Sequence, residues 1–159
     1  MLVAAIVMTM VGLSTGGFHQ RNLEFEASRL AQLFSLAREE AQVRGRPIRF
    51  VADDIGYRFE ALSENQWRLI RDDDTLRERR WDQSTAVRVE SADRPPGAVL
   101  SAPANIGNTA GLPTILFGRE QIDVPFALQL TRDKSIVTLS GDGMGRFKVA
   151  SRTLAAAVQ

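Results

Sequence analysis

The chain has 159 residues, of which 44% are hydrophobic and 25% are charged, and its formal net charge is +1. This is the size and composition of one ordinary globular domain, and the small net charge predicts no general attraction to nucleic acid. The sequence has no cysteine and one histidine, His19. Disulfides, thiolate metal sites and multi-histidine metal sites are therefore excluded. We expect a structural protein with no catalytic site, no metal and no cofactor, because the single histidine lies beside an apolar terminal segment rather than in a cleft.

Residues 1–13 form an uncharged apolar run, and the first charged residue is Arg21. The run is shorter than the roughly 20 residues that a membrane-spanning helix needs. It could also be a secretory signal peptide, although no basic residue precedes it, or a buried core helix. The segment that follows favours one long helix, with residues 1–20 in a membrane or in the core of a fibre. The side chains predicted for that role are Leu2, Val3, Ile6, Val7, Met10, Val11 and Leu13.

Residues 21–45 are predicted to form the amphipathic second half of the same helix. Their apolar side chains recur at steps of three and four, which places them on one stripe. Gly45 favours a helix end, and Pro47 prevents continuation. We expect this stripe to pack against a sheet through Leu23, Ala27, Leu30, Phe34, Ala37 and Ala41.

Residues 46–159 are predicted to form a β-sandwich domain. After Pro47 the apolar pattern changes to a period of two, which is typical of antiparallel sheets with one buried and one solvated face. The predicted strands cover residues 48–50, 57–61, 67–69, 87–89, 126–130, 137–139 and 147–149. Residues 91–113 are rich in proline, glycine and asparagine and are predicted to form a long loop. The fold class is therefore α+β, with a long N-terminal helix packed on an antiparallel sandwich of two sheets.

Three local motifs each allow two interpretations, one as a specific functional site and one as an ordinary structural element. The glycine-rich residues 141–145 favour a hairpin turn over a phosphate loop, because a strand follows them where a phosphate loop needs a helix. The acidic residues 72–74 could hold Ca²⁺, but their spacing favours an exposed polar turn. The basic residues 76–81 favour a solvated edge strand ending in a core tryptophan over a nucleic-acid contact.

Three stretches of the sequence resemble the minor pseudopilins of bacterial type II secretion, specifically the GspH type. The resemblance covers most of the chain and is weakest across residues 91–112. The stretches are LAQLFSLAREEA at 30–41 with RGRPI at 44–48, then Tyr57-Arg58-Phe59 with Trp67, then PTILFG at 113–118 with VPFALQL at 124–130 and Gly145-Arg146. The first is similar to the family's helix end, the second to its first aromatic strands, and the third to its C-terminal sheet.

The resemblance implies a position and a set of partners. The family's basic leader and its Gly-Phe-Thr-Leu-Ile-Glu motif are missing, so we expect residues 1–20 to be N-terminally incomplete and prepilin peptidase to act on a leader not present in this chain. A GspH-type protein is a single-pass protein of the inner membrane, with its globular domain in the periplasm, that later joins the pseudopilus near its tip. There it would link other minor pseudopilins to the major pseudopilin and support protein export. No nucleic acid is expected as a partner.

Two other functions stay open on the sequence alone. A FimT- or FimU-like minor pilin of a type IV pilus, which serves pilus assembly or DNA uptake, shares the fold class. Some of these pilins bind DNA through basic residues near the C-terminus, whereas here Arg152 is the only charged residue after Lys148. The third candidate is a membrane-tethered binding module whose ligand would contact the loop at 91–113.

Overall fold

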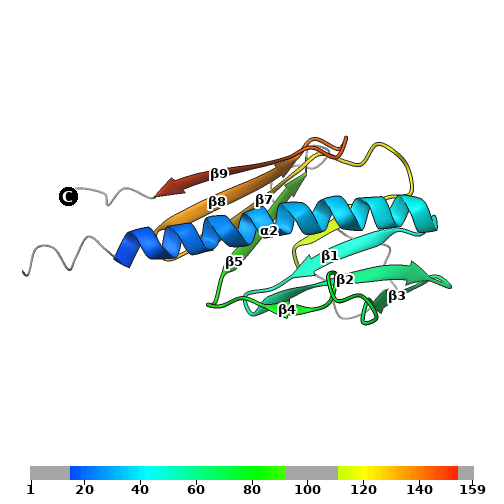
Figure 1. Cartoon of the computed structure of the whole chain (residues 1–159), viewed down its shortest axis with the longest axis horizontal. Coiled ribbons are helices and arrows are strands. Elements are labelled where there is room, and N and C mark those ends of the chain that lie inside the picture. The colour runs from blue at the N-terminus through cyan, green and yellow to red at the C-terminus, as the bar shows by residue number, and fades with distance from the viewer. Residues whose placement is uncertain (1–14, 92–110, 154–159) are drawn as a thin grey trace, which may run out of the picture.

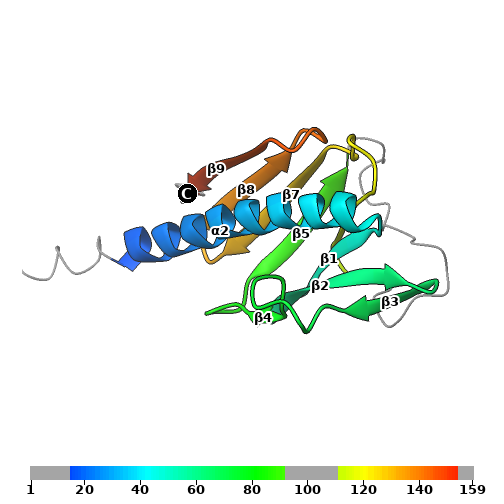
Figure 2. The ribbon, with the colours of Figure 1, turned by 45° about the vertical axis from the view of Figure 1, so that its right-hand side comes forward.

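The computed structural model describes residues 15–91 and 111–153. Helix α2 (Thr15–Arg44) lies across two antiparallel sheets, one on either side of it in Figure 1. The first sheet contains β1 (Ile48–Ala52), β2 (Gly56–Ser63), β3 (Gln66–Leu69), β4 (Arg79–Arg80) and β6 (Thr114–Phe117). The second contains β5 (Ala86–Ser91), β7 (Phe126–Arg132), β8 (Ser135–Gly141) and β9 (Phe147–Thr153). Figure 2 shows how the two sheets diverge around the helix, and the predicted α+β class is confirmed.

The seven residues predicted for a membrane or fibre core lie outside the described residues. These are Leu2, Val3, Ile6, Val7, Met10, Val11 and Leu13. Within the two described ranges, no helix is both long enough and apolar enough to cross a membrane. Most of the predicted loop, residues 92–110, also lies outside them.

Helix α2 ends at Arg44, where Gly45 and Pro47 predicted an end. Gly45 has φ +62°, a left-handed conformation that costs glycine little. This turn lets the Arg46 amide donate to the Ala41 carbonyl at 3.1 Å, which satisfies one of the last carbonyls of the helix. The chain then enters β1 directly, so the helix end and the first sheet are joined without a flexible linker.

The seven strands predicted from the period of two all occur, but β6 was not among them. It pairs with β1, so it belongs to the first sheet, whereas the resemblance had grouped residues 113–118 with the C-terminal sheet. The order of the first sheet is β3-β2-β1-β6, which makes β6 an edge strand. Its partner β1 is distant in the sequence, and its four residues (Thr-Ile-Leu-Phe) show no polar alternation, so local patterning had no signal for it.

The outer face of the first sheet corrects a second expectation, since alternation predicted that Arg49 and Glu60 would be solvated. Arg49 is only 3% exposed, and Glu60 is also buried. Arg49 Nε donates to Glu60 Oε2 at 2.6 Å, and Arg58 Nε donates to Glu60 Oε1 at 2.7 Å. The Arg49 guanidinium also lies 4.5 Å from the ring centre of Trp67. The charges are tolerated inside because they neutralise and hydrogen-bond one another.

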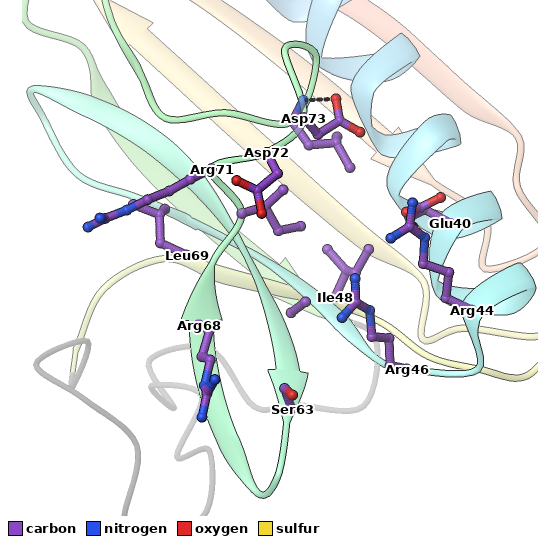
Figure 3. Close-up of a pocket in the computed structure, with 13 residues that line it drawn as sticks. Glu40, Arg44, Arg46, Ile48, Ser63, Arg68, Leu69, Arg71, Asp72 and Asp73 are labelled. Atoms are coloured by element: carbon purple, nitrogen blue, oxygen red, sulfur yellow. Dashed lines mark hydrogen bonds and ion pairs between the residues drawn. The ribbon is translucent and has the colours of Figure 1, made fainter.

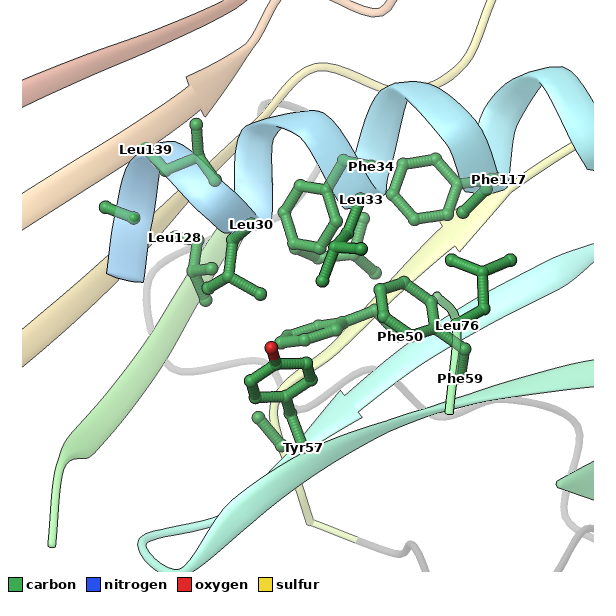
Figure 4. Packing of buried hydrophobic residues seen from close by; sticks show 14 of the residues in the cluster. Leu30, Leu33, Phe34, Phe50, Tyr57, Phe59, Leu76, Phe117, Leu128 and Leu139 are labelled. Atoms are coloured by element: carbon green, nitrogen blue, oxygen red, sulfur yellow. The ribbon is translucent and has the colours of Figure 1, made fainter. Parts of the chain in front are cut away.

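The hydrophobic core lies between α2 and both sheets, and Phe34 is at its centre (Figure 4). Its ring centre is 4.9 Å from that of Phe50 and 5.3 Å from that of Phe117, both in the first sheet. It is also 5.7 Å from Phe126 and 6.0 Å from Phe147, both in the second sheet. One helical side chain therefore joins the two sheets, with most of these contacts close to edge-to-face.

Candidate interaction surface

The predicted packing stripe of α2 lies entirely inside the molecule. Leu23, Ala27, Leu30, Phe34, Ala37 and Ala41 are all fully buried. The helix contacts strands of both sheets, including β1 and β6 in the first and β7, β8 and β9 in the second. Its described part is therefore an integral layer of the globular domain. The opposite face of the helix is open, and Phe25 and Val43 are large apolar side chains exposed on it.

Two buried residues of α2 were absent from the predicted stripe. Leu33 is buried next to Phe34, and Glu26 is only 6% exposed. Burial raises the pKa of Glu26, and the nearby Asp82 carboxylate raises it further. Glu26 lies three residues after Leu23, and Leu33 lies three residues after Leu30, so the helical period places both on the buried side of the helix. This position on the apolar stripe could have predicted that Glu26 is buried.

A cluster of polar contacts fixes residues 118–125, which we call the crossover loop because it connects β6 in one sheet to β7 in the other. Arg38 Nε, on α2, donates to Asp123 Oδ2 at 3.1 Å, and Arg38 Nη2 donates to the Gln121 carbonyl. One turn further along the helix, Gln42 Nε2 donates to the Glu120 carbonyl at 3.1 Å. The helix thus holds the crossover loop by side chains that bind its backbone and its half-buried carboxylate, Asp123.

Asp123 is the shared acceptor of this cluster. Its Oδ1 accepts the Gly118 amide at 2.7 Å, which closes the start of the loop. Its own amide donates to the Gly143 carbonyl at 2.8 Å, which attaches the loop to the β8–β9 turn. The resemblance drew attention to Arg38 through the AREEA motif, but no sequence signal marked Asp123.

The glycine-rich residues 141–145 form the predicted hairpin turn between β8 and β9, with Gly141 opposite Phe147. Asp142 Oδ1 accepts the amides of Met144 at 2.7 Å and Arg146 at 3.1 Å, which lowers the pKa of Asp142. The turn leads into a strand instead of a helix, and its amides already donate to the carboxylate of Asp142. It therefore lacks the free amides and the helix of a phosphate loop.

An apolar groove of about 620 Å³ lies beside the crossover loop. Its walls include β6 and the loop on one side and residues of the second sheet, such as Val89 and Phe126, on the other. Three large apolar side chains along it reach solvent: Leu116 is 52% exposed, Ile122 71% and Val124 48%. A contiguous exposed apolar surface of this kind is typical of a protein contact site.

A second groove, of about 380 Å³, lies between the end of α2 and the β2–β3 hairpin (Figure 3). Charged side chains of both signs surround it, and Arg44 forms an ion pair with Glu40. Asp73 Oδ1 accepts the amides of Thr75 at 2.7 Å and Leu76 at 3.1 Å, and these bonds lower its pKa. The acidic residues 72–74 therefore form the expected polar turn. Across the described residues, no group of three or more acidic, histidine or cysteine side chains is placed to hold a metal ion.

The basic residues 76–81 contribute less strand than expected. Only Arg79 and Arg80 pair with β2, whereas Leu76 and Trp81 at the two ends are buried. Trp81 Nε1 donates to the Asp53 carbonyl at 2.9 Å. The segment is therefore anchored by its apolar ends, and the tryptophan lies in the core as predicted.

Comparisons with known proteins agree with this architecture. The family model described as type II transport protein GspH matches residues 26–145, about three quarters of the chain. A crystal structure of the minor pseudopilin EpsH from the type II secretion system of Vibrio cholerae is similar, with a TM-score of 0.60 and 14% identity over 82% of this chain and 94% of that one. A second structure of the Vibrio cholerae minor pseudopilin EpsH has a TM-score of 0.54 and 17% identity over 87% and 99% of the two chains.

At such identities the two structures establish the fold, and the family model establishes the family. No curated protein matches the chain. The matched region begins within α2 and ends in the β8–β9 turn, so it includes the helix stripe from Ala27 onward, the first sheet, strands β5, β7 and β8 of the second sheet, and the crossover loop with Asp123. The resemblance found in the sequence is confirmed: the chain belongs to the GspH family of type II transport proteins and is a minor pseudopilin of the GspH type.

Proposed function

We propose that this pseudopilin lies near the tip of the pseudopilus and links other minor pseudopilins to the major pseudopilin, thereby supporting protein export across the outer membrane. The observation that carries the proposal is the double role of α2. One face of the helix is buried between the two sheets, while its outer face, with Phe25 70% exposed, is free to contact a neighbour. The protein acts by assembly and catalyses no reaction.

We further propose that residues 1–20 hold the protein in the bacterial inner membrane before assembly, with residues 46–159 in the periplasm. The same apolar segment then moves into the core of the fibre. Residues 21–45 transmit its position to the head, because their buried stripe is part of the head's own core. An aspartate at position 6 costs about 3 kcal/mol at the centre of a membrane helix. Ile6→Asp is therefore expected to reduce both the membrane-bound fraction and incorporation into pseudopili, unlike Ile55→Asp in an exposed turn of the head.

Cross-linking tests the position in the fibre, and the absence of native cysteine makes single-cysteine variants simple to interpret. Phe25→Cys and Val43→Cys place a thiol on the open face of α2, and Ala27→Cys places one in the core as a matched control. With a bismaleimide reagent on assembled pseudopili, we expect the two exposed positions to form adducts with another minor pseudopilin and with the major pseudopilin. Adducts with copies of this chain alone, or none, would contradict the proposal.

A further inference from the structure

Arg46, two residues after the end of α2, has a side chain without a partner. Its Nε atom is buried and has no hydrogen-bond partner among the described residues. It also forms no ion pair with any of them. The neighbouring Arg44 differs, because it is paired with Glu40. A charged donor that is shielded from water and lacks an acceptor is destabilising, so an acceptor supplied by another molecule gains most at Arg46.

The main chain around Arg46 is constrained on both sides. Its amide donates to the Ala41 carbonyl at 3.1 Å, and Gly45 before it has φ +62°. The next residue, Pro47, has a φ that its own ring restricts. The position of the Arg46 side chain is therefore set by the turn that ends the helix, and only its rotamer adjusts to a ligand.

Arg46 lines the groove of about 380 Å³ between the helix end and the β2–β3 hairpin. This volume is within the range of ligand sites in proteins. Figure 3 shows Arg44 and Arg46 extending from the helix end toward this space. The lining also includes the buried apolar side chains of Ile48 and Leu76. The groove therefore has an apolar part and, on the side of the helix, an unpaired positive charge.

Asp72 and Asp73 line the opposite side of the groove (Figure 3). Asp73 accepts the amides of Thr75 and Leu76, and Leu76 is fully buried, so the turn is anchored. Asp72 is exposed and forms no ion pair within the described ranges. Because both sides of the groove are already held, little conformational entropy is lost when a ligand enters.

The two sides of the groove differ in charge, and this difference selects what binds there. A guanidinium group matches a carboxylate with two parallel hydrogen bonds, so Arg46 favours an aspartate or glutamate side chain. Asp72 opposite favours a basic side chain. A segment that carries an acidic and a basic residue close together is complementary to both sides, whereas a purely acidic or purely basic segment is repelled by one of them.

The groove is next to the surface that the proposed function assigns to neighbouring subunits. Val43, on the open face of α2, is 77% exposed and precedes Arg46 by three residues. A subunit that contacts the end of this face therefore has the groove within reach. This continuity favours another pseudopilin as the occupant over a free small anion.

We propose that the groove between the end of α2 and the β2–β3 hairpin binds a mixed-charge segment of a partner pseudopilin, with a carboxylate of the partner on Arg46 and a basic side chain on Asp72. The inference rests on the proposed function, because it takes the occupant from another pseudopilin of the same system. It adds the site, the chemistry of the occupant and its orientation.

Binding measurements test the role of Arg46. The full chain in detergent micelles is mixed, one at a time, with the other purified pseudopilins of its system. We expect Arg46→Gln to weaken binding of one of them at least about tenfold, and Arg46→Lys, which keeps the charge, to weaken it less. Arg152→Gln, at an exposed site on β9 in the other sheet, is the matched control and should leave binding unchanged. The melting temperature of Arg46→Gln should equal that of the wild type, because no internal hydrogen bond is lost.

Zero-length cross-linking identifies the partner's carboxylate. A carbodiimide couples amines to carboxylates, and Lys134 and Lys148 are the only native lysines. Arg46→Lys therefore adds one amine in the groove, and Arg152→Lys adds one outside it. We expect the first variant, but not the second, to form a new cross-link to an aspartate or glutamate of the partner. Mass spectrometry of the linked peptides should place a basic residue close to it.

The other outcomes overturn the proposal in distinguishable ways. If a pseudopilin binds equally well to Arg46→Gln, the groove is not its site, while the proposed function stands. Coupling of the introduced lysine only to carboxylates of its own chain would mean that the groove is closed by its own charges. A cross-linked dimer that forms without a partner would indicate a second copy as the occupant. If no pseudopilin binds at all, the proposed function fails together with the inference.

Discussion

The Arg38 guanidinium lies 3.1 Å from the Asp123 carboxylate, 85 residues further along the chain, and this pair joins the helix to the crossover between the two sheets. Both side chains are largely shielded from solvent. An ion pair in such a position gains more from Coulomb attraction than an exposed pair, but each partner depends on the other for its hydrogen bonds. The pair therefore fixes the crossover loop to the helix, in addition to the core contacts that join the helix to both sheets.

Removing the carboxylate should destabilise the protein substantially. Asp123→Ala leaves the Arg38 Nε–H and the Gly118 amide without their acceptor, so we expect the free energy of unfolding to fall by about 2–3 kcal/mol. Urea denaturation of the wild type and the variant measures this difference. Arg88→Ala is the control, because its ion pair with Glu90 is exposed and is expected to contribute at most about 0.5 kcal/mol. If the free energy of unfolding falls equally in the two variants, the contact between Arg38 and Asp123 stabilises the protein no more than an exposed ion pair does.

Among the glycines of the β8–β9 turn, we expect Gly143 to tolerate substitution least. It has φ +79°, and a Cβ there would overlap with the Asp123 carbonyl oxygen and lie 3.4 Å from Pro125 Cδ. Gly45 also has a positive φ, +62°, but a Cβ there meets nothing within 4 Å. Gly45→Ala should therefore cost only the conformational penalty of about 1 kcal/mol, and Gly143→Ala clearly more. Thermal unfolding of the two variants side by side distinguishes backbone strain from steric overlap.

Phe34→Ala should cost about 3–5 kcal/mol, because it removes the side chain that contacts both sheets and leaves a cavity between them. Phe25→Ala is the matched control on the same helix, where the ring is 70% exposed, and it should change the free energy of unfolding by less than about 0.5 kcal/mol. Denaturant titration measures both. A small loss at Phe34 would show that the sheets close over the cavity.

The sequence predicts those elements correctly in which the local period of apolar residues matches the buried face in the structure. Helix α2 shows this, since a stripe of six residues, a terminal glycine and a following proline indicate the same element. The sequence was insufficient where burial depends on distant partners. Arg49 and Glu60 have the pattern of a solvated face, yet they are buried because they pair with each other across β1 and β2.

The crossover contact was unpredictable for a related reason. Asp123 lies between Ile122 and Val124 in a short loop that has no regular period, and its partner is on a helix 85 residues earlier. Strand β6 likewise becomes an edge only because a connection brings it back beside β1. Family resemblance supplied part of what patterning could not, since it covered Arg38 and residues 113–118, but it placed those residues in the wrong sheet.

Glu26 should make stability depend on pH in a direction that is unusual for a carboxylate. Its pKa in the folded state is raised, first by burial and then by Asp82, while Arg29, Arg132 and Arg79 act in the opposite direction. Because the folded pKa exceeds the unfolded value, the stabilisation from proton binding is present below the unfolded pKa and is lost as pH rises through the folded pKa. Glu26→Gln removes this dependence. We expect the variant to be more stable than the wild type at pH 7, with the difference shrinking toward pH 4 in urea titrations.

Glu24, two positions earlier, provides the opposite test. Its pKa is lowered, first by the hydrogen bond from Ser151 and then by that from Gln20. A lowered folded pKa contributes stability above the unfolded pKa, and this stability is lost as pH falls through the folded pKa. Glu24→Gln should therefore be less stable than the wild type at pH 7, and the difference should vanish in acid. If Glu26→Gln is also less stable than the wild type at pH 7, then burial does not control the ionisation of Glu26, and its place on the apolar stripe of α2 must be compensated by the surrounding arginines Arg29, Arg132 and Arg79.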